Sequence, residues 1–148
     1  MNLNFYTKFL YTFFYVGVSP IAPGTVASLV ASILWFNIPN VMYLQVSIIM
    51  IAVIFGIYLS KGIFSNNADK DPSIFVLDEV AGMWISLFML PKNLGMYLLA
   101  FCLFRFFDIL KPSIILHADR SSSYYSIMLD DIFAGIITLI ICSQVALL

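Results

Sequence analysis

The chain has 148 residues, of which 62% are hydrophobic, 16% are aromatic and only 10% are charged, with a formal net charge of −1. Soluble domains have about 25% charged residues, so this composition excludes an ordinary soluble protein and indicates a single membrane-embedded domain, residues 1–148. The small net charge also excludes a basic surface for nucleic acid. Cys102 and Cys142 stand apart in apolar segments, which argues against a disulfide framework or a zinc site.

In chain order, the first predicted element is an aromatic-rich stretch at 5–18, which is too short to span a bilayer easily. No small-residue cleavage site follows it, so an interfacial or half-inserted helix is favoured over a signal peptide. Five longer apolar segments, each close to bilayer length or somewhat short of it, are predicted at 23–38, 41–60, 74–90, 94–110 and 127–148. The expected fold is an all-α polytopic membrane bundle of about five membrane-embedded helices plus the short N-terminal helix.

The basic residues predict the orientation of this bundle. If the segment at 23–38 runs outward from the cytoplasm, Lys92 lies outside and the other loop cations lie inside, in agreement with the positive-inside rule. The cations placed on the cytoplasmic side are Lys8, Lys61, Lys70, Lys111 and Arg120. All eight acidic residues lie between positions 69 and 131 and fall at the same end. The charges are therefore predicted to converge on the cytoplasmic face.

Two of the apolar helices begin with paired acids, Asp78 and Glu79 in DEVAG and Asp130 and Asp131 in DDIFAG. Small residues follow at helical spacing, namely Gly82 and Ser86 in the first helix and Gly135 and Thr138 in the second. Such strips let helices approach closely in lipid, which would bring the four carboxylates together. Four adjacent carboxylates repel unless a cation lies among them, and hard oxygen ligands favour Mg²⁺ over Zn²⁺. The alternative for each pair is a helix N-terminal cap.

The stretch FRFFDILKP places Arg105, Asp108 and Lys111 three residues apart, on one helix face near the cytoplasmic end of the segment at 94–110. Arg and Lys beside a metal site are groups that bind phosphate oxygens. A self-neutralising ion pair between Arg105 and Asp108 is a second interpretation, and the two are compatible.

The stretch SPIAPGTVAS brings proline, glycine and hydroxyl residues to the start of the first long helix. A helix start at Gly24 and Thr25 leaves backbone N–H groups available to an anion. The alternative is a plain start signal, which every membrane helix needs. The anion-binding interpretation gains support because this end is also predicted to be cytoplasmic.

Together, the stretches GVSPIAPGTVAS, VLDEVAGMW, FRFFDILKP and IMLDDIFAG resemble the phosphatidylglycerophosphatase A family in order, spacing and setting, over about positions 15 to 138. The resemblance implies a Mg²⁺-dependent phosphatase of the bacterial inner membrane, with a cytoplasmic active face. Its substrate would be a membrane phospholipid, phosphatidylglycerophosphate, which it would convert to phosphatidylglycerol and phosphate in glycerophospholipid biosynthesis. The sequence departs from the family pattern at DRSSSYYSIM (119–128), where a glycine-rich stretch is more usual.

The resemblance also implies the site residues. The catalytic residues would be Asp78, Glu79, Arg105, Asp108, Lys111, Asp130 and Asp131. Substrate would be bound by Pro23, Gly24, Thr25, Arg105 and Lys111, and Mg²⁺ by Asp78, Glu79, Asp130 and Asp131. In-line attack by water and an aspartyl-phosphate intermediate are both compatible with these residues, and the sequence does not indicate the oligomeric state.

Two other classes of function are alternatives. Intramembrane acids mark the ion path of ion-coupled transporters, but here the charges gather at one face and no inverted repeat is evident. A non-catalytic membrane subunit would leave four charged motifs unexplained. His117 is the only histidine and lies outside all four motifs, so histidine-based phosphatase chemistry is not expected.

Overall fold

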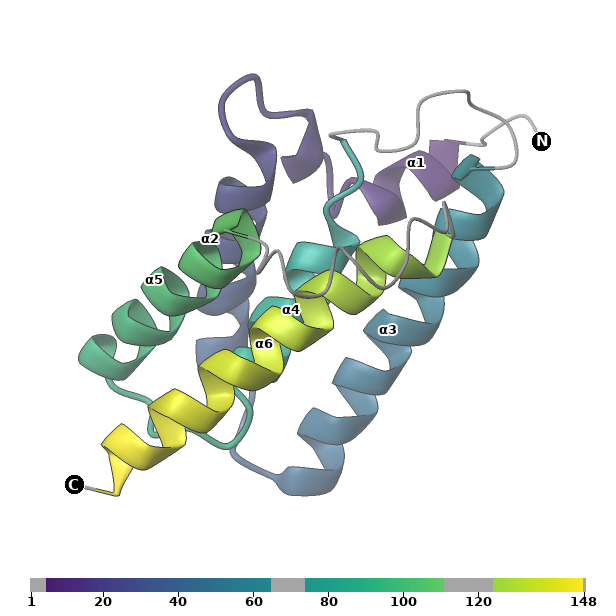
Figure 1. Cartoon of the computed structure of the whole chain (residues 1–148). Helices are drawn as coiled ribbons and strands as arrows, with labels where there is room; N and C mark the ends of the chain where they lie inside the picture. The colour runs from purple at the N-terminus through teal and green to yellow at the C-terminus, as the bar shows by residue number, and fades with distance from the viewer. Residues whose placement is uncertain (1–4, 65–73, 111–123, 148) are drawn as a thin grey trace.

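A computed structural model of the chain describes residues 5–64, 74–110 and 124–147 (Figure 1). These ranges contain helices, turns and irregular loops, and no strand lies within them. The elements are α1 (Phe5–Tyr11), η1 (Val16–Val18), α2 (Pro23–Asn37), α3 (Met42–Phe64), α4 (Leu77–Ser86), α5 (Leu94–Leu110) and α6 (Tyr124–Ala146). The all-α prediction is therefore confirmed for the described part of the chain, and the segment predicted at 94–110 coincides with α5.

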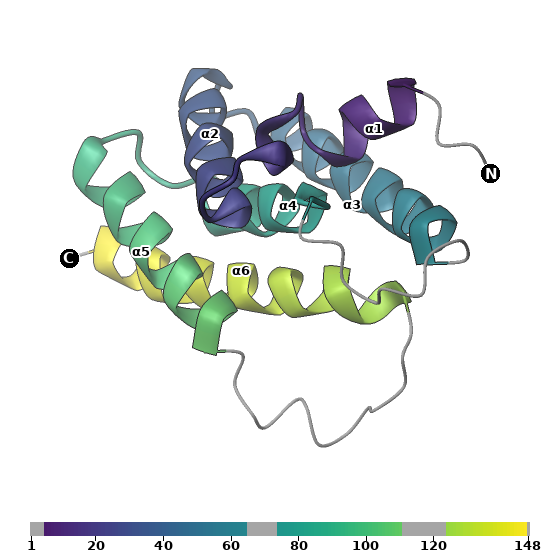
Figure 2. The ribbon, with the colours of Figure 1, turned by 90° about the horizontal axis from the view of Figure 1, so that it is seen from above.

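The central helix of the molecule is α4, although it has only ten residues. It contacts α2, α3, α5 and α6, and Figure 2 shows it between α2 and α3 on one side and α6 on the other. At 1.5 Å per residue α4 is about 15 Å long, or about half of a hydrocarbon core. The apolar segment predicted at 74–90 therefore contains a helix that is shorter than expected, Leu77–Ser86. This run is apolar because protein surrounds it, and hydropathy does not separate burial in protein from burial in lipid.

Two helices are long and apolar enough, by length and composition, to cross a membrane. The candidate spans are Met42–Lys61 in α3 and Met128–Ala146 in α6. The helices α2 and α5 have 15 and 17 residues, short of the roughly 20 that a span needs. Five spanning helices are thus not confirmed within the described ranges, and the structure supports a membrane protein with two candidate spans.

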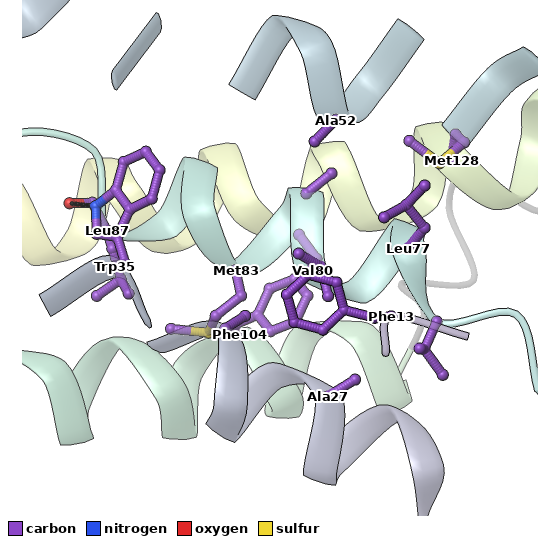
Figure 3. Close-up of a cluster of buried hydrophobic side chains, with 14 of the residues drawn as sticks. Phe13, Ala27, Trp35, Ala52, Leu77, Val80, Met83, Leu87, Phe104 and Met128 are labelled. Carbon is purple, nitrogen blue, oxygen red and sulfur yellow. Dashed lines mark hydrogen bonds between the residues drawn. The ribbon is translucent and has the colours of Figure 1, made fainter. Parts of the chain in front are cut away.

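The apolar core lies along α4. Figure 3 shows Val80 and Met83 of α4 near Phe104 of α5, and Leu87 close to Trp35 of α2. All five side chains are fully buried. The Trp35 indole N–H donates a hydrogen bond to the Leu87 carbonyl oxygen at 3.2 Å, just beyond the end of α4. The core therefore holds α4 between its neighbours and satisfies a carbonyl group at its C-terminus.

Polar side chains also support the irregular backbone that follows α4. Gln45 of α3 is fully buried, and its Oε1 accepts a hydrogen bond from the Met89 backbone N–H at 2.9 Å. Its Nε2 donates to the Pro39 carbonyl oxygen at 3.2 Å and to Asn40 Oδ1 at 3.0 Å. Irregular backbone at membrane depth is tolerated only where such partners satisfy it. The network lets α4 end inside the protein.

Candidate active site

Three of the four paired acids meet where α4 packs against α6. Asp78 and Glu79 belong to the first turn of α4 and Asp131 belongs to α6. One carboxylate oxygen from each lies within 4.8 Å of the others. Asp78 and Asp131 expose only 6% and 4% of their surface. Asp130 is half-buried and is not part of this group, because successive helix residues point about 100° apart.

Close approach of two glycines brings these acids together. A Cβ atom on Gly135 would lie 2.5 Å from the carbonyl oxygen of Gly82. A Cβ on Gly82 would lie 2.6 Å from the Asp131 carbonyl oxygen. Only glycine leaves this space free, so the backbones of α4 and α6 touch. The prediction that small residues bring the two acidic helices into contact is confirmed for this pair of glycines.

The basic part of the site comes from α5. Arg105 Nη1 forms an ion pair with Asp108 Oδ2 at 2.7 Å, one helical turn away. The predicted ion pair is therefore present. Arg105 Nε is buried and has no hydrogen-bond partner in the described part of the chain, so the guanidinium group keeps a donor for another acceptor. Lys111 and His117 lie outside the described residues.

The start of α2 contacts both the acidic and the basic parts. A Cβ on Gly24 would lie 2.2 Å from Glu79 Oε1 and 3.4 Å from Arg105 Nη1. The N-cap residue of α2 is Ala22, which makes no side-chain capping bond, and Pro23 has no N–H group. The positive end of the α2 dipole therefore lies beside the Glu79 carboxylate. Thr25 is half-buried in the same turn.

The clustered carboxylates need a neutralising partner. Asp78 and Glu79 lie outside the two candidate spans, and burial raises the pKa of both groups. The Glu79 charge raises the pKa of Asp78 further. Glu79 Oε2 is buried with no hydrogen-bond partner among the residues that are described. A proton or a cation relieves such repulsion, and converging carboxylate oxygens are ligands of Mg²⁺, so these residues fit a hard divalent cation.

One supporting residue escapes prediction from sequence. The Phe104 ring is fully buried, and its Cε2 atom would lie 2.7 Å from a Cβ on Gly82. Through this contact Phe104 seats α5 on α4 one residue before Arg105. The sequence does not single it out, because it stands in a run of three phenylalanines interrupted only by Arg105.

Comparison with known proteins matches residues 9–146 to the family described as Phosphatidylglycerophosphatase A. The chain is 37% identical over 125 residues to phosphatidylglycerophosphatase A of Escherichia coli (strain K12), covering 82% of this chain and 73% of the relative. It is 36% identical over 124 residues to the Haemophilus influenzae protein of that name, covering 81% and 76%. A putative phosphatidylinositol-3-phosphatase of Bacteroides thetaiotaomicron is 34% identical over 133 residues, 84% of either chain. No solved structure matches the chain.

Proposed function

We propose, because the chain belongs to the phosphatidylglycerophosphatase A family, that it hydrolyses phosphatidylglycerophosphate to phosphatidylglycerol and inorganic phosphate. Family membership makes the chain a lipid phosphatase, and its own residues support the chemistry. The observation that carries the proposal is the meeting of Asp78, Glu79 and Asp131 with Arg105 at one end of the bundle. An acidic cluster beside a partly buried guanidinium group suits a phosphate monoester held together with a cation.

We infer that Asp78, Glu79 and Asp131 hold Mg²⁺, whereas Asp130, the fourth ligand expected from the sequence, lies outside this group. When bound, the ion supplies positive charge that polarises the phosphoryl group. The inference is supported by the buried oxygen of Glu79 that has no hydrogen-bond partner in the described ranges. It is also supported by the close packing of three carboxylates, which is unfavourable without a counter-charge.

The remaining site residues bind and orient the phosphate. Arg105 donates to phosphoryl oxygens, and Asp108 is a positioning residue because it holds the guanidinium group from one turn away. Lys111 supplies a second predicted cation. Backbone N–H groups of Gly24 and Thr25 at the α2 start add further donors. These groups stabilise the negative charge on the phosphoryl oxygens in the transition state.

Two routes break the phosphorus–oxygen bond with this set of residues. In the first, water attacks phosphorus, a carboxylate accepts the water proton and the glycerol oxygen leaves and gains a proton. In the second, an aspartate oxygen attacks phosphorus while the glycerol oxygen leaves and gains a proton, and water then hydrolyses the aspartyl phosphate. Acid quenching during turnover with ³²P-labelled substrate separates the routes, because only the second leaves label on the protein.

We further infer that α2, α4 and α5 are embedded in the bacterial inner membrane beside the two candidate spans, with the site at the cytoplasmic end. The substrate would then keep its acyl chains in the inner leaflet while its phosphate reaches the acids. The inference is supported by the charge distribution, since Lys61 ends the candidate span in α3, where Leu59 lines the same groove as Leu77, the residue before Asp78. Such a site acts in glycerophospholipid biosynthesis.

Phosphate release by purified protein tests the proposal. We expect release from phosphatidylglycerophosphate with Mg²⁺ and none in excess EDTA, with recovery when Mg²⁺ is restored. Asp78→Asn and Asp131→Asn should each lower kcat by at least about 100-fold, because each removes charge at the phosphoryl group. Asp69→Asn removes the same charge outside the four motifs and should change kcat by less than about twofold. Full turnover in EDTA would contradict the metal role, and wild-type turnover in the acid variants would contradict the site.

A second candidate substrate is phosphatidylinositol 3-phosphate, which the name of the Bacteroides relative favours. Both lipids present a phosphate monoester at headgroup depth, so the acids and Arg105 suit either. Rates measured on the two lipids side by side decide between them. A kcat/KM higher for phosphatidylinositol 3-phosphate would replace the proposed substrate and keep the phosphatase chemistry.

A further inference from the structure

An apolar groove of about 350 Å³ lies between the N-terminal segment, α3 and α4. One side is formed by residues of α3 from Ile48 to Leu59, and another by aromatic residues that include Phe13 and Phe14. The helix α4 contributes Leu77 and Trp84. Figure 1 shows α1 beside the C-terminal end of α3, which is the end that carries the candidate active site.

We propose that this groove holds one acyl chain of the lipid substrate, an inference that rests on the proposed function. The groove reaches the first turn of α4, because Leu77 lines it and Asp78 and Glu79 belong to the same turn. Its length also fits: the eleven-residue step from Leu59 to Ile48 is about 16 Å along the helix. That distance is about half of a 30 Å hydrocarbon core and therefore about one leaflet. A lipid with its phosphate at the acids would direct a chain along this path.

The N-terminal segment is shaped to form a wall of this groove. Phe13, Phe14 and Tyr15 have φ angles of 46°, 58° and 67°, a left-handed run that reverses the chain after α1. Non-glycine residues rarely adopt this conformation, and it persists only where surrounding contacts hold it. The Thr12 hydroxyl holds the turn, since its Oγ1 accepts the Tyr15 N–H at 3.1 Å and donates to the Lys8 carbonyl oxygen at 2.7 Å. As a result, Phe13 and Phe14 both line the groove.

The groove sets the position of the bound acyl chain and adds little to the affinity of the protein for the lipid. A chain that leaves the bilayer for an apolar groove gains little from the hydrophobic effect, because lipid is equally apolar. A chain seated between α3 and α4 is instead held in one direction relative to Asp78. The groove therefore fixes the phosphate over the acids, and an obstruction in it should discriminate between long and short chains.

Two isoleucines of α3 provide a matched pair of variants. Ile51 lines the groove and Ile54 does not, and each exposes 57% of its surface, so neither substitution should prevent folding. Ile51 lies eight residues from Leu59, or about 12 Å along the helix, beyond the reach of a six-carbon chain. The probes are phosphatidylglycerophosphates with two eighteen-carbon or two six-carbon chains. Ala52→Leu narrows the same groove and serves as a second variant.

We expect Ile51→Phe to lower the ratio of kcat/KM for the eighteen-carbon over the six-carbon substrate by about tenfold. Ile54→Phe should leave this ratio at the wild-type value. A separate readout needs no catalysis: phosphatidylglycerol with brominated eighteen-carbon chains should quench Trp84 fluorescence saturably, and less so in Ile51→Phe. Trp35, the other tryptophan, stacks on Trp84 with ring centroids 5.5 Å apart and adds to the same signal in every variant.

Equal ratios and equal quenching in Ile51→Phe, Ile54→Phe and wild type would overturn the acyl-chain proposal, because the groove would then hold only bulk lipid. Absence of phosphate release from both substrates in the wild type would instead contradict the proposed function. In that case the bromine quenching still decides whether a lipid chain occupies the groove.

Discussion

The Glu79 side chain lies between three parts of the site, namely the other acids, the start of α2 and Arg105 of α5. Its carboxylate belongs to the acid group with Asp78 and Asp131. Its Oε1 also lies where a side chain on Gly24 would stand, next to Arg105. The conformation of Glu79 therefore depends on the absence of a side chain at the start of α2.

A Gly24→Ala substitution tests this dependence. The added Cβ would lie 2.2 Å from Glu79 Oε1, which is the far end of a flexible side chain, so Glu79 can rotate away with little cost to the fold. Gly24 is buried, but because the clashing carboxylate can move, we expect Tm to change by only a few degrees. We expect kcat to fall at least about tenfold, because the displaced carboxylate leaves the acid group.

Gly95→Ala is the matched control. Gly95 is also the second residue of a helix, and its nearest neighbour to an added Cβ is Asn93 Oδ1 at 3.5 Å, an ordinary contact. This substitution should leave kcat unchanged and slightly raise Tm, since alanine favours the helix. Equal kcat in Gly24→Ala and wild type would show that the position of Glu79 does not matter for turnover.

The paired acids illustrate what the sequence can and cannot reveal about the site. The motifs predict that acids of two helices meet, and Asp78, Glu79 and Asp131 do meet. The motifs do not distinguish Asp130 from Asp131, however, whereas in the structure only Asp131 belongs to the acid group. Asp131 lies on the same helix face as Gly135, which touches α4, whereas Asp130 points away by about 100°. The sequence alone does not say which acid of a pair faces the neighbouring helix.

Among the elements, hydropathy predicts the limits of α5 correctly and those of α4 incorrectly. The predicted limits of 94–110 match α5 because Pro91 and Asn93 precede it and its interior has no competing break. The predicted segment 74–90 instead contains the ten-residue α4. The helix α4 ends before the apolar segment does because of long-range contacts, such as the hydrogen bond from Met89 N–H to Gln45 Oε1. The local hydropathy pattern contains no information on such contacts.

A Gly135→Ala substitution tests the packing of α4 on α6. The new Cβ would lie 2.5 Å from the Gly82 carbonyl oxygen. This is backbone, so one helix must move. We expect the free energy of unfolding to fall by about 1–3 kcal/mol, the usual cost of overpacking. Because the same contact positions Asp131 beside Asp78, kcat should fall as well. Thermal unfolding in detergent and phosphate release measure the two effects.

Gly56→Ala is the comparison for this prediction. Its Cβ would lie 2.6 Å from Met128 Sδ and 2.7 Å from Met128 Cε, and a methionine side chain can move aside at small cost. Tm should therefore fall less in Gly56→Ala than in Gly135→Ala, with kcat near that of the wild type. The reverse order of Tm would mean that the α4–α6 contact is not the tightest constraint on the acids.

At the scale of the whole molecule, the two ends of the bundle differ in their chemistry. The site end joins acids and Arg105 from α4, α5 and α6. At the opposite end Lys92 Nζ donates to the carbonyl oxygens of Phe36 and Ile38, which ties the loop before α5 to the end of α2. That lysine satisfies backbone groups of the fold. Which of these ends faces the cytoplasm stays a prediction, in which the acids lie at the cytoplasmic end and Lys92 outside.

Cysteine labelling in cells tests that orientation. Cys102 and Cys142 are free thiols, so both are first replaced by serine. A cysteine at position 93, where Asn93 is exposed before α5, should react with an impermeant thiol reagent in intact cells. A cysteine at position 122, outside the described residues, should react only in inverted vesicles, and the cysteine-free background should react in neither. Labelling of position 122 from outside would place Asp78, Glu79 and Asp131 away from the cytoplasm, and the proposed access of the site to an inner-leaflet lipid would be wrong.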